Sequence, residues 1–206
     1  FRQVHSWQEL GVNCPLAVNL SAQDLRDPGL IERISGLFAT WATPPHLIEF
    51  ELTESALMED PAGALETMLR LRTLGVRLVV DDFGTGYSSL GYLQKLPVNA
   101  LKIDQSFVMS MLSNAGSAVI VRSTIELGHN LGLGVVAEGV ESEALWNALR
   151  ELGCDTAQGY FVSKPIPADD MPSWAAQSSW HSEKTPAEGT RPDLCFPDPL
   201  ASRELR

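Results

Sequence analysis

Polar side chains stand at or just after the carboxyl end of nearly every strand that the sequence predicts. A single acidic residue after a strand is most often a turn former or a helix cap. The set is more persuasive than its members, because six separate strand ends would each have to be polar by accident. The residues are Asn19, Glu51, Asp81, Asp82, Lys102, Asp104, Glu138 and Gln158.

Four of the carboxylates among these residues could share one site, which would require cations between the negative charges. They are Glu51, Asp81, Asp82 and Glu138, and the amide of Asn19 adds a further oxygen. Ligand sets made only of oxygen suit Mg²⁺ or Mn²⁺. Two such ions about 3.5–4 Å apart stabilise both the attacking and the leaving oxygen in phosphoester cleavage. The adjacent aspartates would let one carboxylate bridge two ions while the other holds a water.

Lys102 lies between Leu101 and Ile103 in an otherwise apolar strand. An unpaired lysine in a buried strand is costly, so the sequence indicates a function for this ammonium. It would orient the attacking water or neutralise charge on the phosphorane. An alternative treats Lys102 as the Schiff-base lysine of a barrel aldolase, and the surrounding carboxylates argue against it.

A glycine-rich segment, FGTGYSS at 83–89, follows the paired aspartates directly. Gly84 and Gly86 either form an ordinary turn or belong to a loop that closes over the site and brings backbone N–H groups near phosphate. Glu54 and Glu141 are either solvated or brace a loop. The residue types alone leave both alternatives open.

The elements that must position these groups alternate along the chain. Residues 1–10 are typical of the last turns of a helix that ends at Gly11. Strands separated by helices predict βαβ units and a parallel sheet. Strands are expected at 16–20, 48–53, 77–80, 100–103, 134–137 and 156–158. Helices are expected at 30–41, 61–75, 90–96, 118–131 and 142–152.

Two α/β architectures compete, an open doubly wound sheet and a (β/α)8 barrel. Polar groups at all strand ends favour the barrel, where these ends converge on one rim, over an open sheet with one switch point. About six of eight strands are visible, so we expect an incomplete barrel over residues 1–174 that lacks an N-terminal piece. Residues 175–206 have no periodicity and are interpreted as a flexible tail or linker.

Composition excludes several classes of function. The chain has 206 residues, 44% of them hydrophobic, and a net charge of −11, which argues against binding to DNA or RNA polymers. No apolar run approaches the ~20 residues of a membrane span. Cys14, Cys154 and Cys195 are widely spaced and are interpreted as reduced thiols of a cytoplasmic protein. The four histidines form no pair at zinc-binding spacing.

The chain resembles the EAL-domain family of cyclic di-GMP phosphodiesterases in five segments and in a closing segment, AQGYFVSKPIP at 157–167. The likeness runs in order from about residue 1 to residue 174. The DDFGTGYSSL and AEGVE motifs are its most specific parts. The five segments are VNLSAQDL (18–25), FELTES (50–55), VDDFGTGYSSL (80–90), LKIDQSFV (101–108) and VVAEGVES (135–142).

This resemblance implies a TIM-like (β/α)8 barrel with one antiparallel strand, and hydrolysis of cyclic di-GMP to linear pGpG with Mg²⁺ or Mn²⁺. It also implies a homodimer and an upstream sensor or diguanylate cyclase domain. The metal ligands would be Asn19, Glu51, Asp81, Asp82 and Glu138. Lys102 would position the nucleophilic water. Asp104 and Gln158 would line the site, Glu54 would anchor the glycine loop, and Glu141 would support the rim.

The name-giving Glu-Ala-Leu motif, which this family carries on an early strand upstream of the helix at 1–10, is not found in the expected place. The tripeptide occurs only at 143–145, where it follows the Ser142 cap inside a helix. One metal ligand and about two strands are therefore expected to be absent, so the chain is interpreted as an N-terminally truncated copy with weak or no hydrolysis. The alternative is a catalytically inactive module that binds cyclic di-GMP as a sensor.

Overall fold

A computed structural model describes residues 1–86 and 90–178 of the chain. Its single sheet has six strands in the order of the sequence, and every neighbouring pair is parallel. No described strand is antiparallel, so the antiparallel strand that the resemblance implies is not among these six. The strands are β1 (Leu16–Asn19), β2 (Ile48–Thr53), β3 (Arg77–Phe83), β4 (Ala100–Ile103), β5 (Gly134–Ala137) and β6 (Thr156–Ala157).

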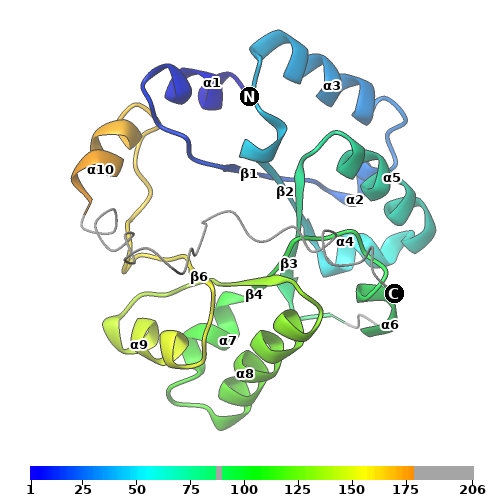
Figure 1. Ribbon diagram of the computed structural model, residues 1–206. Helices are drawn as coiled ribbons and strands as arrows, with labels where there is room; N and C mark the ends of the chain where they lie inside the picture. The colour runs from blue at the N-terminus through cyan, green and yellow to red at the C-terminus, as the bar shows by residue number, and fades with distance from the viewer. Residues whose placement is uncertain (87–89, 179–206) are drawn as a thin grey trace, which may run out of the picture.

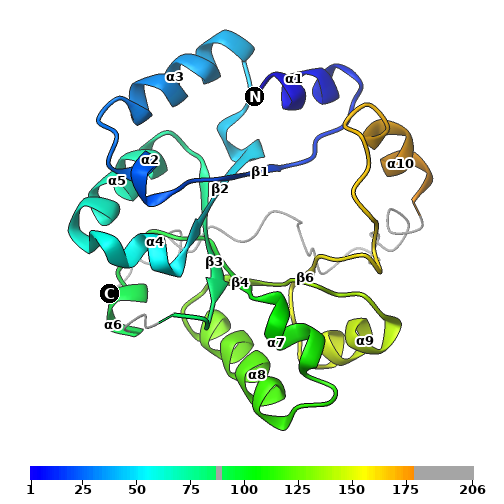
Figure 2. The same cartoon turned by 180° about the vertical axis from the view of Figure 1, so that it is seen from behind.

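The sheet curls, and helices surround its outer side (Figure 1). The curl is open between β1 and β6, as the view from behind also shows (Figure 2). The predicted incomplete TIM-like barrel is therefore confirmed. The helices are α1 (Arg2–Glu9), α2 (Ala22–Leu25), α3 (Leu30–Trp41), a 3₁₀ turn (Pro45–Leu47), α4 (Glu54–Glu59), α5 (Pro61–Thr73), α6 (Leu90–Leu93), α7 (Gln105–Ser110), α8 (Ala115–Asn130), α9 (Glu143–Glu151) and α10 (Met171–Gln177).

Local sequence signals explain most helix ends. Asp60 caps α5 by accepting the Gly63 N–H at 3.1 Å, and Ser142 caps α9 by accepting the Leu145 N–H at 3.3 Å. Asn114 caps α8, so this helix begins three residues before the predicted start at 118. Helix α10 continues to Gln177, past the expected domain boundary at 174. The rest of the predicted tail, from 179 on, lies outside the described residues.

Alternation along the strands separates an apolar face from a polar one. Phe50, Leu78 and Leu101 pack in one core cluster with the helix residues Met68 and Leu71. A second cluster joins β4 and β5 to α7, α8 and α9. The residues between these positions along the strands, among them Glu51, Asp81 and Lys102, therefore face away from the helices, toward the inside of the curl.

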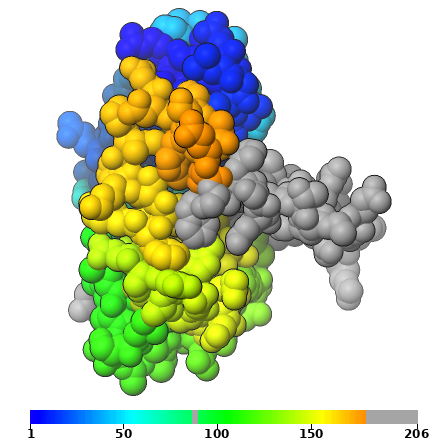
Figure 3. Space-filling model, turned by 90° about the vertical axis from the view of Figure 1, so that its left-hand side faces the viewer, coloured from blue at the N-terminus to red at the C-terminus, as the bar shows by residue number. Residues whose placement is uncertain are grey.

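One contact joins the two ends of the open sheet. The indole Nε1 of Trp7, on α1, donates a hydrogen bond of 2.9 Å to the carbonyl of Ala168, 161 residues away. Figure 3 shows the segment after β6 and α10 lying against α1 on this side of the molecule. The N-terminal helix and the chain after the last strand are thus neighbours across the opening.

Candidate active site

Lys102 is the centre of the site, because its ammonium contacts three carboxylates at once. Its Nζ lies 2.7 Å from Glu138 Oε1, 2.8 Å from Glu51 Oε1 and 3.2 Å from Asp81 Oδ1. The lysine side chain is only 5% exposed. The partners come from β2, from β3 and from the residue after β5, so three elements far apart in the sequence meet on one rim. The predicted convergence of strand ends is found for these residues.

An irregularity in β3 places Asp82 beside Asp81. The pairing of β3 with β4 shifts register between Val80 and Phe83, and Asp82 has a φ of +52°, which is strained for a residue with a side chain. The Asp82 N–H donates to Asp81 Oδ1 at 3.0 Å, and the hydroxyl of Thr85 donates to the Asp82 carbonyl at 2.9 Å. This bulge lets two successive residues face one site, which a regular strand does not allow.

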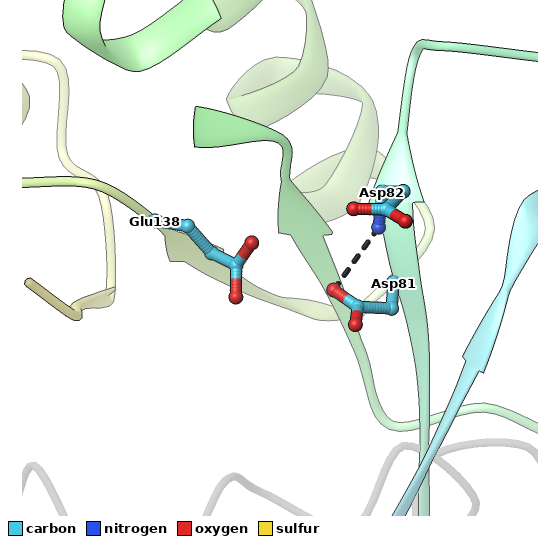
Figure 4. Close-up of side chains that lie close together, drawn as sticks. All are labelled: Asp81, Asp82 and Glu138. Atoms are coloured by element: carbon cyan, nitrogen blue, oxygen red, sulfur yellow. Dashed lines mark hydrogen bonds between the residues drawn. The ribbon is translucent and has the colours of Figure 1, made fainter. Parts of the chain in front are cut away.

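Asp81, Asp82 and Glu138 each offer one carboxylate oxygen within 4.8 Å of the other two. Figure 4 shows the two aspartates on β3, with Glu138 facing them from the end of β5. A set of carboxylate oxygens at this spacing matches the donors that hard divalent cations such as Mg²⁺ and Mn²⁺ prefer. The side chains of the described chain therefore fit the kind of metal expected from the sequence.

The electrostatics of the site show how crowded the negative charges are. Burial raises the pKa of Asp82, and the nearby charges of Asp81 and Asp104 raise it further. Burial also raises the pKa of Glu138, against the opposing effect of Lys102. Burial alone would lower the pKa of Lys102, but its hydrogen bonds to Glu138 and Glu51 outweigh that effect and raise it. The lysine is therefore a permanent cation.

Glu54 joins the site to the glycine loop. This glutamate begins α4, is only 2% exposed, and its Oε2 accepts the N–H groups of Gly84 at 3.2 Å and Gly86 at 3.3 Å. Gly84 has a φ of +100°, a conformation that favours glycine. Glu54 therefore braces the described part of the loop, the second of the two alternatives for this residue, while residues 87–89 lie outside the described chain.

The structure places the other candidates near the rim but gives them different contacts. Asn19 ends β1 and is the register partner of Glu51. Asp104 caps α7 by accepting the Ser106 N–H at 3.0 Å. The Gln158 backbone bridges Ala137 and Val140. Within the described chain, the side chains of Asn19, Gln158 and Glu141 make no hydrogen bond or ion pair with the lysine cluster.

The sequence and the fold of this chain match those of a known protein family. A family model for the EAL domain matches residues 1–165. The chain belongs to the EAL domain family. The crystal structure of the EAL domain of Mycobacterium smegmatis DcpA is similar to this chain, with a TM-score of 0.82 and 38% sequence identity. The match covers 86% of this chain and 80% of the DcpA chain. The PaMucR phosphodiesterase in complex with c-di-GMP matches with a TM-score of 0.80 and 38% identity, over 82% of this chain and 69% of that one.

Curated relatives extend the comparison. The cyclic di-GMP phosphodiesterase RocR of Pseudomonas aeruginosa is 41% identical over 159 residues, which are 77% of this chain and 41% of RocR. The bifunctional diguanylate cyclase/cyclic di-GMP phosphodiesterase MucR of the same organism is 41% identical over 172 residues, 82% of this chain and 25% of MucR. This EAL chain thus spans less than half the length of these relatives.

Two further expectations can be compared with the described residues. None of the helices in the described ranges is long and apolar enough to cross a membrane. Cys154 is a free thiol, while Cys195 lies outside the described part of the chain, so the expectation of three reduced thiols stays a prediction.

The sequence did not reveal which acidic groups pair with the buried ammonium of Lys102. It placed this lysine at the site as a residue that positions water, but not as the common partner of three carboxylates. The available signal was the cost of burying an ammonium in an apolar strand, which requires acceptors of opposite charge. Only the curl of the sheet shows that Glu51, Asp81 and Glu138 provide them.

Proposed function

We propose that this EAL domain hydrolyses cyclic di-GMP to linear pGpG with the help of Mg²⁺ or Mn²⁺ held at the carboxylate rim. The observation that carries this proposal is the meeting of Asp81, Asp82 and Glu138 around the strand ends of a family whose named members include cyclic di-GMP phosphodiesterases. The domain is taken to comprise residues 1–174, and the full protein to act in the cytoplasm.

The reaction consumes one water, which forms a bond to one phosphorus while the bond from that phosphorus to the 3′ oxygen breaks. The product pGpG keeps the phosphate on its 5′ end and gains a 3′ hydroxyl. Bound divalent cations activate water and offset negative charge on the phosphate. Asn19, Glu51, Asp81, Asp82 and Glu138 would hold them.

The remaining residues would orient the reactants. The ammonium of Lys102 lies among the carboxylates, and once cations bind these carboxylates it would donate a hydrogen bond to the water and offset charge on the phosphate oxygens. Asp104 and Gln158 would line the site, and Glu141 would support the rim. The loop of Gly84 and Gly86, braced by Glu54, would connect the site to a homodimer interface. In the full protein an upstream sensor or cyclase domain would control the activity.

A second candidate function is binding of cyclic di-GMP without turnover. It is favoured by the position of Glu143-Ala144-Leu145, which lies in α9 with Glu143 exposed, so this tripeptide adds no ligand to the rim. For the 206-residue chain we therefore expect weak or no hydrolysis, and tight nucleotide binding without turnover would support this second candidate.

The test is a chromatographic assay of cyclic di-GMP conversion to pGpG by the full-length protein, with Mg²⁺, with Mn²⁺ and with chelator. Metal-dependent pGpG formation that is lost in Asp81→Asn supports the phosphodiesterase. Binding of cyclic di-GMP by calorimetry with no pGpG in either metal supports the sensor. Absence of both binding and turnover contradicts both candidates.

A further inference from the structure

We propose that Lys102 is an internal counter-cation, whose ammonium holds the carboxylates of the site in place before any metal binds. The inference rests on the proposed function, because the same rim is taken to be the metal site. It goes beyond the water-positioning role expected from the sequence, since it assigns the lysine a task in the metal-free protein. The carboxylates are those of Glu51, Asp81 and Glu138.

The geometry matches donors to acceptors one for one. An ammonium has three N–H groups, and Lys102 Nζ lies within 2.7–3.2 Å of one oxygen from each of three carboxylates. The contacted atoms are Oε1 of Glu51, Oδ1 of Asp81 and Oε1 of Glu138. Each carboxylate therefore contacts the lysine through one oxygen and retains a second oxygen that can serve as a cation ligand.

The charges explain why such a counter-ion is needed. The four side chains are between 5% and 18% exposed, so water screens their repulsion only weakly. A buried ion pair that loses one partner leaves an uncompensated charge, which is strongly destabilising. One ammonium offsets only part of the charge of three carboxylates and Asp82, so the rim keeps a net negative charge that attracts a divalent cation.

The same ammonium must also oppose metal binding, because like charges repel at this range. Replacing Lys102 by a neutral side chain of similar length should therefore have two effects of opposite sign. The metal-free protein should lose stability, and the stabilisation that it gains from metal should increase. A lysine that only positions water predicts neither effect on stability.

The experiment compares thermal unfolding of the wild-type chain and of Lys102→Met, with chelator and with millimolar Mn²⁺ at pH 8. We expect the metal-free melting temperature to fall by roughly 10 °C in Lys102→Met. The rise on adding Mn²⁺ should be at least about twice that of the wild type. A variant that folds only with Mn²⁺ supports the inference equally.

Arg77→Met is the matched control. Arg77 Nε pairs with Glu49 Oε2 at 3.0 Å, the two side chains are 15% and 18% exposed, and the pair joins β2 to β3 at their opposite, amino-terminal end. This variant also removes a largely buried cation, so it should lower the melting temperature. It should leave the Mn²⁺-induced rise unchanged, because the lost charge lies away from the rim.

The variant Lys102→Arg tests whether the positive charge at residue 102, rather than the shape of the lysine side chain, accounts for the effects. Because it keeps the positive charge, we expect a metal-free melting temperature closer to the wild type than that of Lys102→Met, and no enlarged response to Mn²⁺. Equal loss in both variants would overturn the inference. If Mn²⁺ stabilises the wild type, a Lys102→Met response to Mn²⁺ no larger than that of the wild type would overturn it as well. If Mn²⁺ stabilises none of the four proteins, the proposed metal site fails, while the comparison of Met with Arg without metal still decides whether Lys102 is a counter-cation.

Discussion

The carboxylate of Glu54 and the backbone of Gly86 are in direct contact, with Glu54 Oε2 accepting the Gly86 N–H at 3.3 Å. A Cβ built on Gly86 would lie 2.9 Å from both Cδ and Oε1 of Glu54, closer than real Cβ atoms approach other groups. Glu54 is buried and also holds Gly84, so it has little freedom to withdraw. The brace between helix α4 and the glycine loop therefore depends on the absence of a side chain at residue 86.

We expect Gly86→Ala to destabilise the protein by about 1–3 kcal/mol, the usual cost of forcing an extra methyl group into an occupied space. Gly36→Ala is the matched control, because Gly36 lies inside α3 and nothing is within 4 Å of its added Cβ. That change should stabilise the protein by about 0.5–1 kcal/mol. Urea unfolding measures both, and equal stability of the two variants would contradict the proposed brace.

Asp82 has a strained backbone and also contributes a carboxylate to the acidic cluster. Its replacement should therefore change the stability of the fold and the affinity for Mn²⁺ in opposite directions. We expect Asp82→Gly to stabilise the metal-free protein by about 1 kcal/mol, since glycine adopts the φ of +52° without strain. The same change should weaken Mn²⁺ binding, because one carboxylate of the cluster is lost. Denaturant unfolding and Mn²⁺ titration followed by electron paramagnetic resonance measure the two effects.

Ala42→Gly is the control for strain alone. Ala42 ends α3 with a φ of +48°, similar to that of Asp82, but it lies outside the carboxylate rim. It should gain stability by a similar amount, about 1 kcal/mol, without any change in Mn²⁺ binding. Loss of stability in Asp82→Gly alongside a gain in Ala42→Gly would show that the Asp82 side chain stabilises the bulge.

The sequence was sufficient for the six strands and for the meeting of Lys102 with Glu51 and Asp81, because both follow from local rules. Parallel strands end on the same side, so polar residues at their ends had to gather. It was not sufficient for Asp82, which was expected after a strand ending at Val80. The strand continues to Phe83 because a shift in its pairing with β4 accommodates the strained residue, and such a shift depends on a partner about 20 residues away.

Short helices were missed for a different reason. Helix α7 has six residues and buries only Val108, and α10 has seven residues and buries none of them, so each is too short for an apolar spacing to repeat over several turns. Each is held by contacts at its ends: Asp104 caps α7, and the chain before α10 is bonded to Trp7. Periodicity cannot reveal elements that are fixed by tertiary contacts.

Cys154 should be an unreactive thiol. Burial raises its pKa to about 11, so almost none of it is the nucleophilic thiolate at neutral pH. We expect iodoacetamide at pH 8 to modify Cys154 much more slowly in the folded chain than in urea. Peptide mass spectrometry measures the two rates. Equal rates in the two conditions would contradict the burial of this thiol.

Two aspartates with opposite pKa shifts should give stability profiles of opposite slope in the metal-free protein. The pKa of Asp82 is raised by burial and by neighbouring acids, so the folded state holds its proton longer than the unfolded state. This side chain therefore destabilises the fold progressively as pH rises from its ordinary pKa near 3.8 through its raised value. The pKa of Asp24 is lowered by hydrogen bonds from Ser21, so its contribution is present above pH 3.8 and is lost as pH falls through the lowered value.

Substitution by asparagine should reveal both slopes. Relative to the wild type, Asp82→Asn should gain stability as pH rises from 3 to 7, with the gain absent at the acidic end. Asp24→Asn should lose stability at pH 7, because the Asp24 carboxylate forms a reciprocal cap with Ser21 at the start of α2, and the loss should shrink toward pH 3. Urea unfolding in the presence of chelator at several pH values measures the differences. If the stability differences of the two variants changed with pH in the same direction, the charge environments of these aspartates would be alike. That result would contradict the crowding of acids around Asp82 and the capping role of Asp24.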